Sequence, residues 1–473
     1  MAQRVGFAPE EETGNARFAL FRSAVCRTLN RVAPGCGRRV TEVEVLQESW
    51  EFGPELRRRR MAAGLSLQQL GQRVHYSKSQ LSKVERELKR PTPELARLCD
   101  TELGARGAPT RLVPVRGSQP SLPGPESDDE VWLMQLRKDG SSSFQPVTRR
   151  DVIAGAASAL TLGATDPRVL PPVPGGAETL VEASRMLFDQ FRRLGQVSGP
   201  AGVLPSLIAQ THSLEQFARC SGPRARRDLL LLASRYAEYA GWMAQESGDD
   251  TAAIWWTERA VQLAAAGRDT VLAAYAQVRR SLISLYRGDV EDAAQLAEHA
   301  LHSDASARVR GLAAQHLAQA RAVEGDYDSC MRSLDRSRDL LERSCVETGQ
   351  PVLGASHVPD VVSMFTGWCL YDLGRPREAA VHLDTETARI PAHAFRTRAR
   401  YGVRRALAHA AAGDVDHACA ITAEVLPSVR LIHSSTVRSD LHRLFRTLGR
   451  HARQRSVRAL VPDLTDALTS RTT

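Results

Sequence analysis

The segment from residue 77 to residue 85 carries the side chains whose chemistry is easiest to interpret. If it forms a helix, one face presents long or small hydrogen-bonding groups: Lys78, Ser79, Gln80, Ser82 and Lys83. Groups of these types hydrogen-bond to base edges in the major groove of DNA and neutralise phosphates. The pattern therefore indicates a helix that reads nucleic acid.

Two preceding helices are needed to position that segment. Ser77 is a favourable N-cap, and Leu81 and Val84 can point inward. A second helix is expected after the N-cap Ser66, with an apolar face, and a first helix from Pro54 to the stop at Gly64. The expected inward residues of these two helices are Leu56, Met61, Ala63, Leu67, Leu70 and Val74. Three short helices and tight turns predict a small helical bundle.

The charge of this region agrees with a nucleic-acid partner. Residues 54–97 contain eleven Lys or Arg and four Asp or Glu. A basic face alone is weak evidence, because charged residues mostly face solvent. Together with the turn chemistry and the helix spacing, it favours binding to the phosphate backbone of DNA.

The region resembles the phage-repressor-type (Cro/C1, XRE) helix-turn-helix family. The motifs that carry the resemblance are Gly64-Leu65-Ser66, the segment from Ser77 to Glu85 and the segment from Arg90 to Ala96. The resemblance implies base contacts from Lys78, Ser79 and Lys83, with Ser77, Gln80 and Ser82 on the same helix. It also implies phosphate contacts near Gln68, Lys89 and Arg90, and an ion pair between Arg60 and Glu85.

Two residues depart from that family's pattern. His75 and Glu87 stand where the family usually has glycine, at positions that favour positive φ. Histidine tolerates the left-handed conformation better than most residues. Glu87 is expected to be strained there and to place a carboxylate near phosphates, so weaker DNA binding or a different exit angle is expected.

The whole chain of 473 residues has room for several domains and carries a net charge of +9. Its eight cysteines form no C-x-x-C pair, which is typical of reduced thiols. No apolar run approaches the roughly 20 residues that cross a bilayer. These features predict a soluble, cytoplasmic protein without a membrane partner.

Composition divides the chain into four parts. Residues 1–50 read as a flexible extension, or as a stretch upstream of a later true start. Residues 51–107 hold the helix-turn-helix, and residues 108–176, rich in Pro, Gly and Ser, read as a linker. The linker segment 148–163 pairs two arginines with an apolar run, as export signals do. Its internal position favours a short helix that packs on a neighbouring domain, with weak membrane or partner docking as the alternative.

Residues 177–469 show an internal repeat. Glycines at 248, 288, 325, 374 and 413 recur at spacings of 40, 37, 49 and 39, each followed by Asp or Arg. Five residues after each glycine stands Ala253, Ala293, Cys330, Ala379 or Ala418. Glycine can end one helix, aspartate can cap the next, and the small residue permits close approach. The pattern resembles tetratricopeptide-type helical repeats, and the longest interval places an insertion at 345–360 on one rim.

Such arrays bind ligands in a concave groove lined by the first helix of each pair. The candidate groove residues are Arg235, Tyr239, Trp242, Arg279, Tyr286, Gln315, Trp368 and Arg404. The aromatic members fit interhelix core at least as well. No phosphate-loop, dinucleotide, metalloprotease or nucleophile-elbow motif is present. His299 and His302 have no further metal ligands nearby, so no metal ion is expected. Because the motifs named above are missing, neither an enzyme nor another cofactor is expected.

The sequence thus predicts an all-α protein: a helix-turn-helix bundle, a flexible linker and a tetratricopeptide-like superhelix. The predicted function is a transcriptional regulator that binds double-stranded DNA at an operator as a homodimer. Its repeat domain would sense a peptide or small molecule, or mediate dimerisation. The alternative is an interaction scaffold that recruits a protein partner and contacts DNA only non-specifically. The resemblance further suggests a regulator of the actinobacterial type.

Overall fold

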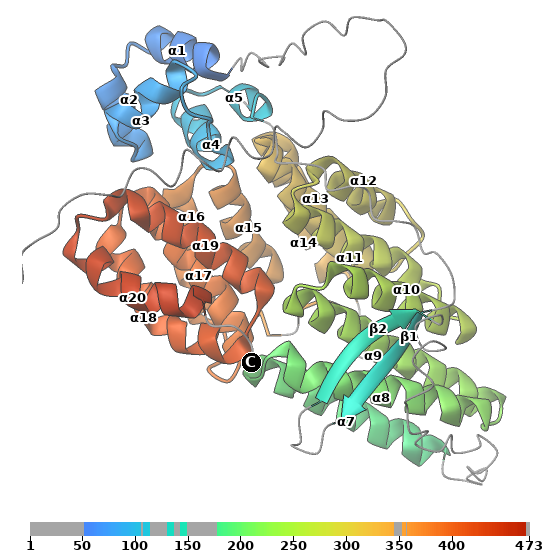
Figure 1. Ribbon diagram of the computed structural model, residues 1–473. Helices are drawn as coiled ribbons and strands as arrows, with labels where there is room; N and C mark the ends of the chain where they lie inside the picture. The colour runs from blue at the N-terminus through green and yellow to red at the C-terminus, as the bar shows by residue number, and fades with distance from the viewer. Residues whose placement is uncertain are drawn as a thin grey trace, which may run out of the picture. The chain divides into compact units, whose positions relative to one another are not determined.

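The computed structural model describes residues 52–105, 107–113, 130–136, 142–148, 177–344, 352–355 and 357–469. Almost all of these residues are helical, which confirms the expected all-α class (Figure 1). Among them, no helix is long and apolar enough to span a membrane. The predicted extension at 1–50 and most of the segment 148–163 lie outside the described residues.

The N-terminal bundle contains five short helices. They are α1 (Phe52–Ala62), α2 (Leu67–Val74), α3 (Lys78–Glu85), α4 (Pro93–Glu102) and α5 (Ala108–Arg111). Its core includes Leu56, Leu70, Val74, Leu81 and Val84, as the sequence predicts. Because Val113 also belongs to this core, the bundle continues past the boundary predicted at residue 107.

The first helix differs from the prediction in its start and in its buried face. It begins at Phe52, before Pro54, and Phe52 is buried together with Leu56. Met61 and Ala63 are exposed. The reason is the helical period: Phe52 and Leu56 are four residues apart on one face, whereas Met61 is five residues from Leu56 and lies on another face.

The turns of the bundle have the conformations that their residues predict. Gly64 ends α1 with φ 67°, and His75 ends α2 with φ 55°. Glu87 has φ 59° after α3. Ser66 and Ser77 each accept a hydrogen bond from a backbone N–H, and both form a complete capping box with the glutamine three residues on. The turn between α2 and α3 is therefore fixed by local chemistry.

The region predicted as a linker contains regular structure. Strands β1 (Glu130–Leu136) and β2 (Ser142–Thr148) pair in antiparallel register, with Glu130 opposite Thr148. The sequence between them includes Asp139-Gly140, a dipeptide that favours tight hairpin turns. The region predicted as a linker, 108–176, therefore includes a pair of hydrogen-bonded strands.

The remainder is an array of helices that pack against their neighbours in the sequence. Its first part contains α7 (Ala177–Val197), α8 (Pro200–Arg219), α9 (Pro223–Ser247), α10 (Asp250–Ala266), α11 (Val271–Arg287), α12 (Val290–Leu301), α13 (Ala307–Glu324) and α14 (Tyr327–Glu342). Its second part contains α15 (Val361–Asp372), α16 (Pro376–Ala388), α17 (Phe395–Ala412), α18 (Val415–Ile432), α19 (Ser435–Leu448), the 3₁₀ turn η2 (Gly449–His451) and α20 (Arg455–Thr469).

The repeated glycines and the residues that follow them have the predicted local structure. All five glycines have positive φ, between 78° and 94°. Asp249, Asp289 and Asp326 cap the next helix through their side chains, whereas Asp414 makes no such bond. The small residue five positions on is fully buried in every case. Each site therefore joins two antiparallel helices at close range.

The array also closes on itself. Helix α17 packs against α7, and α19 packs against α9, although these helices are far apart in the sequence. Separate apolar cores lie in the two parts of the array, so polar contacts carry much of this closure. The closure brings α9, α11 and α13 to face α17 across a cavity.

Candidate functional site

The outer face of α3 presents the residues that the sequence predicts for DNA contact. Seven of the nine predicted side chains are exposed: Gln68, Ser77, Lys78, Ser79, Lys83, Lys89 and Arg90. Gln80 and Ser82 are half-buried. Ser77 and Gln80 are also engaged in the capping box, with a 3.2 Å bond from the Gln80 N–H to Ser77 Oγ. Lys78, Ser79 and Lys83 are therefore the best placed to meet base edges.

A partly buried ion pair holds α3 against α1. Arg60 donates from Nε to Glu85 Oε1 at 2.6 Å and from Nη2 to Oε2 at 2.9 Å. The hydrogen bonds that Arg60 donates to Glu85 raise the pKa of Arg60. Two parallel bonds fix the orientation of the guanidinium, so this pair sets the angle of α3. It is the ion pair expected from the sequence.

Replacing Glu87 with glycine should tighten non-specific DNA binding. Removing a Cβ from a residue at φ 59° relieves about 1 kcal/mol of backbone strain, and losing the carboxylate removes repulsion from phosphates. Fluorescence anisotropy with random-sequence duplex measures the affinity. Glu87→Gln is the matched control, because it removes the charge and keeps the strain. Unchanged affinity in both variants would show that position 87 lies away from the DNA.

The bundle contacts the array through α4 and the turn before α3. Arg450 of η2 forms an ion pair with Glu94, and its guanidinium carbon lies 4.1 Å from the ring centre of Tyr76. The hydroxyl of Thr101 donates to the carbonyl of Leu373 at 2.8 Å. Because these contacts use α4 and the turn, the outer face of α3 remains exposed.

A cavity of about 180 Å³ lies inside the array, where α17 faces α9, α11 and α13. It exceeds the roughly 150 Å³ of an engineered apolar cavity that binds benzene. Apolar side chains that line it include Val278, Leu282, Leu312 and Phe365. Six arginines line it as well: Arg192, Arg235, Arg279, Arg396, Arg400 and Arg404. The cavity is thus large enough for a small organic molecule and rich in positive charge.

Part of the insertion predicted on the rim runs along this cavity. Residues Val352 to Ala355 and His357 to Val358 line it. Arg192 Nη1 donates to the carbonyl of Val352 at 3.2 Å, and Arg308 Nε donates to that of Leu353 at 2.9 Å. Leu353 is buried against the array. Residues 352–354 are therefore held by α7 and α13, and with residues 355, 357 and 358 they form one wall.

Seven of the eight candidate groove residues line this one cavity: Arg235, Tyr239, Trp242, Arg279, Tyr286, Gln315 and Arg404. Trp368 does not. Its ring is buried between the guanidinium of Arg404, 4.2 Å away, and the stacked ring of Tyr371. Trp368 therefore belongs to the core, the alternative environment predicted for the aromatic residues.

Sequence reasoning missed the cavity arginines Arg396 and Arg400. They precede Arg404 by eight and four residues, so all three lie on one face of α17. That spacing was a usable signal. The partners of these residues carried no signal, because Glu246 lies about 150 positions away in the sequence.

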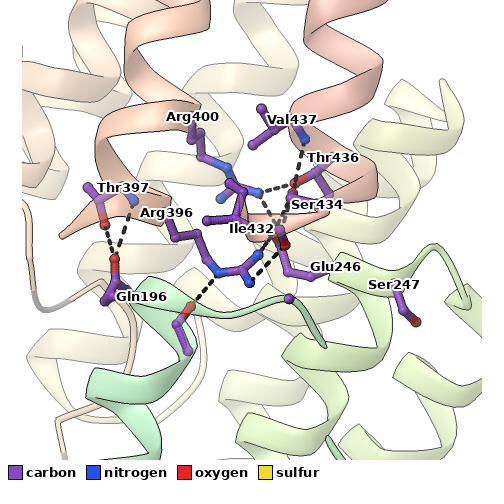
Figure 2. Close-up of polar contacts among 12 residues, drawn as sticks. Gln196, Glu246, Ser247, Arg396, Thr397, Arg400, Ile432, Ser434, Thr436 and Val437 are labelled. Carbon is purple, nitrogen blue, oxygen red and sulfur yellow. Dashed lines mark hydrogen bonds and ion pairs between the residues drawn. The ribbon is translucent and has the colours of Figure 1, made fainter. Parts of the chain in front are cut away.

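Figure 2 shows the Glu246 cluster, which consists of Glu246, Arg396, Arg400, Ser434 and Thr436. Glu246 is fully buried and accepts from Arg396 Nη1 at 2.7 Å and from Arg400 Nη2 at 2.9 Å. The hydroxyls of Ser434 and Thr436 donate to the same carboxylate at 2.6 and 2.8 Å. The cluster thereby joins α9 to α17 and α19 at the point where the array closes.

The charge balance of the cluster fixes the ionisation of Glu246. Burial alone raises the pKa of the carboxyl, but Arg400, Arg396 and the two hydroxyls offset it and bring the pKa to about 2. The carboxylate therefore stays ionised at neutral pH. Its charge is matched by hydrogen bonds at both oxygens, as a buried charge requires.

The stability of the array should fall in acid because of Glu246. A depressed folded-state pKa contributes stability that is complete above the ordinary value of 4.5 and is lost as the pH falls toward about 2. Urea unfolding followed by circular dichroism between pH 6 and pH 2.5 measures this loss. A variant with glutamine at position 246 should show a shallower loss over the same range; equal slopes would contradict the assignment.

Among the described residues, one group has the geometry for a metal ion. The ligand atoms of Asp384, His409 and His417 lie within 4.8 Å of one another. Arg405 already pairs with Asp384, at 2.5 Å, and its Nη2 lies 3.5 Å from His417 Nε2. A guanidinium in this position repels a cation, so the group is better explained as a surface hydrogen-bond network.

Residues 51–113 match the family model described as a helix-turn-helix domain. This match covers α1 to α5 and extends to the same residue as the observed core. No curated protein and no solved structure is significantly similar to the chain. The chain therefore carries a helix-turn-helix domain at its N-terminal bundle, and the array is understood from its own geometry.

Proposed function

We propose that this protein is a transcriptional regulator whose helical array senses a small ligand or peptide and controls operator binding by the helix-turn-helix domain. The observation that carries the proposal is the exposed basic face of α3, set on a rigid turn, in a chain that also encloses an arginine-lined cavity. We assign the domain to the Cro/C1 type and place the protein in the cytoplasm of an actinobacterial-type host.

The array is assigned to the tetratricopeptide-like class. Helix pairs joined at a glycine of positive φ, with a small buried residue five positions on, support this assignment. The proposed regulator acts as a homodimer, because repressor-type readers bind two half-sites about one helical turn apart. Dimerisation through the array would set the spacing of the two readers.

A continuous set of contacts between the cavity and the helix-turn-helix domain supports communication between them. Arg404 lines the cavity and stacks on Trp368, which stacks on Tyr371. Tyr371 donates to Glu94 of α4 at 3.5 Å, and Asp372 lies 3.9 Å from Arg97. A ligand that moves Arg404 would therefore disturb residues that hold the bundle against the array.

Selection of genomic fragments with the purified full-length protein tests the proposal. A regulator should enrich one two-fold site and prefer it over random DNA by at least about a thousandfold. A scaffold that contacts DNA only non-specifically should bind all fragments alike and lose affinity steeply with salt. Sequence-blind enrichment would overturn the proposed function.

A further inference from the structure

The cavity arginines differ in how well the fold satisfies their hydrogen bonds. Arg396 donates to Glu246 and to the carbonyls of Gly195, Ser198 and Ile432. Arg404 donates to Asp440 and to the hydroxyl of Tyr286, both at 2.9 Å. These guanidiniums are held in place by the fold itself.

Arg235 and Arg279 are as deeply buried, each 5% exposed, but are poorly paired. Arg235 reaches Asp269 only at 3.5 Å, and its Nε and Nη1 have no hydrogen-bond partner among the described residues. Arg279 donates to Gln245 at 2.9 Å but lies 3.8 Å from Glu238, and its Nε is unpartnered within the same set. Buried N–H groups without partners are costly, so a folded protein normally satisfies them.

Neutral polar groups beside these arginines are unsatisfied too. Gln315 and His316 of α13 line the cavity and are 4% and 8% exposed. Gln315 Oε1 and His316 Nδ1 have no partner in the described part of the chain. Burial, together with Arg279 and Arg400, lowers the pKa of His316 to about 3, so the ring is neutral at pH 7. The residues that line the cavity thus include several with buried polar atoms that the described fold leaves unpaired.

The net charge of the cavity wall is positive. Its six arginines face one lining carboxylate, Glu238, and three more carboxylates pair with them from behind: Glu246, Asp269 and Asp440. Four carboxylates leave two guanidinium charges without a counter-ion. In a site of low dielectric, that excess attracts an anion strongly.

We propose that the cavity binds a small organic anion, whose carboxylate or phosphate group pairs with Arg235 and Arg279 while its apolar body packs against Val278, Leu312 and Phe365. This inference rests on the sensing role proposed above and names the chemical class of its ligand. An acidic group supplies the negative charge that the four carboxylates leave unmatched beside these weakly paired arginines. The apolar lining excludes a bare inorganic ion as the best occupant.

Isothermal titration of the full-length protein tests this ligand class. The probes are benzoate and phenyl phosphate, with benzyl alcohol as the neutral analogue and inorganic phosphate as the head group alone. Both organic anions should bind at least about tenfold more tightly than benzyl alcohol and than inorganic phosphate. The tighter organic anion identifies the preferred head group. Equal affinity for benzyl alcohol and benzoate would overturn the proposal.

Variants place the site. Arg235→Gln and Arg279→Gln should each weaken binding of the preferred probe about tenfold or more, because each loses a charge-assisted contact. Arg224→Gln is the matched control, an exposed arginine on the same helix α9, and should bind normally. Retained binding in both cavity variants would overturn the inference. If one variant misfolds by circular dichroism, the other variant and the wild-type probe series still decide.

Failure of this inference is separable from failure of the proposed function. Operator selection is measured without any probe, so a protein that selects an operator but prefers no anion refutes only the ligand class. A protein that binds the anions but selects no operator refutes only the regulatory role. Anion binding that changes operator affinity supports both.

Discussion

Replacing Glu246 with alanine should destabilise the array by about 3–5 kcal/mol. The substitution removes the carboxylate that Arg396 and Arg400 share. Arg396 is only 2% exposed, so water cannot replace that carboxylate. The hydroxyls of Ser434 and Thr436 lose an acceptor in the same place. A buried guanidinium without a counter-ion costs far more than the loss of the side chain's own packing. Urea unfolding monitored by circular dichroism measures the change.

A matched control separates this effect from the general loss of a glutamate. Glu378 on α16 also pairs with an arginine, Arg375, at 3.0 Å, but its side chain is 54% exposed. Glu378→Ala should change stability by no more than about 1 kcal/mol, because solvent screens the exposed pair. Similar losses in the two variants would mean that the Glu246 cluster does not hold the array closed.

The closure shows the limit of what local patterns could predict. Glycine, aspartate and a small residue at fixed spacing were enough to place the turns at Gly248, Gly288 and Gly325, since each turn is determined by neighbouring residues. The contact of Glu246 with Arg396 joins residues 150 positions apart. A single glutamate at that distance has no periodic or chemical mark that identifies its partner. Its role depends on the curvature of the whole array.

The functional residues also divide into those that a local motif predicts and those whose environment depends on the whole array. The exposed face of α3 and the Arg60–Glu85 pair follow from a local motif, and the structure places them as expected. The cavity residues were predicted because they lie on the first helix of each pair. The same criterion included Trp368, which does not line the cavity. Trp368 lies beneath Arg404 because a large flat ring gains more from stacking and burial than from lining a cavity. Helical position alone does not distinguish these two environments.

The strands β1 and β2 show what an average composition conceals. The surrounding Pro, Gly and Ser made residues 108–176 resemble a linker, and the short runs Glu130–Leu136 and Ser142–Thr148 were averaged into that composition. Each run contains aromatic and β-branched residues, and a tight-turn dipeptide lies between them. Composition over a long window hides elements of seven residues.

Changing Lys78 and Lys83 together to alanine should abolish operator selection and weaken specific binding by at least about a hundredfold. Both ammonium groups lie on the exposed face of α3, which is held by the capping box at Ser77 and the Glu85–Arg60 pair. The fold should survive, because neither side chain is buried. Electrophoretic mobility shift with the selected site and with random duplex measures both affinities.

Salt dependence then assigns the two lysines to bases or to phosphates. If both contact phosphates, the slope of log affinity against log salt should fall by about 1.8, and binding should weaken alike on all sequences. If both contact base edges, specific binding should fall about one to three kcal/mol per lysine while random-duplex binding changes little. The control is the double variant Arg224→Ala and Arg227→Ala, which removes two positive charges from exposed positions on α9. This control should select the operator normally. Because α3 is the helix that the turn presents outward, we expect the base-edge result for at least one of the two. Operator selection that persists in the double variant would mean that another element reads the DNA.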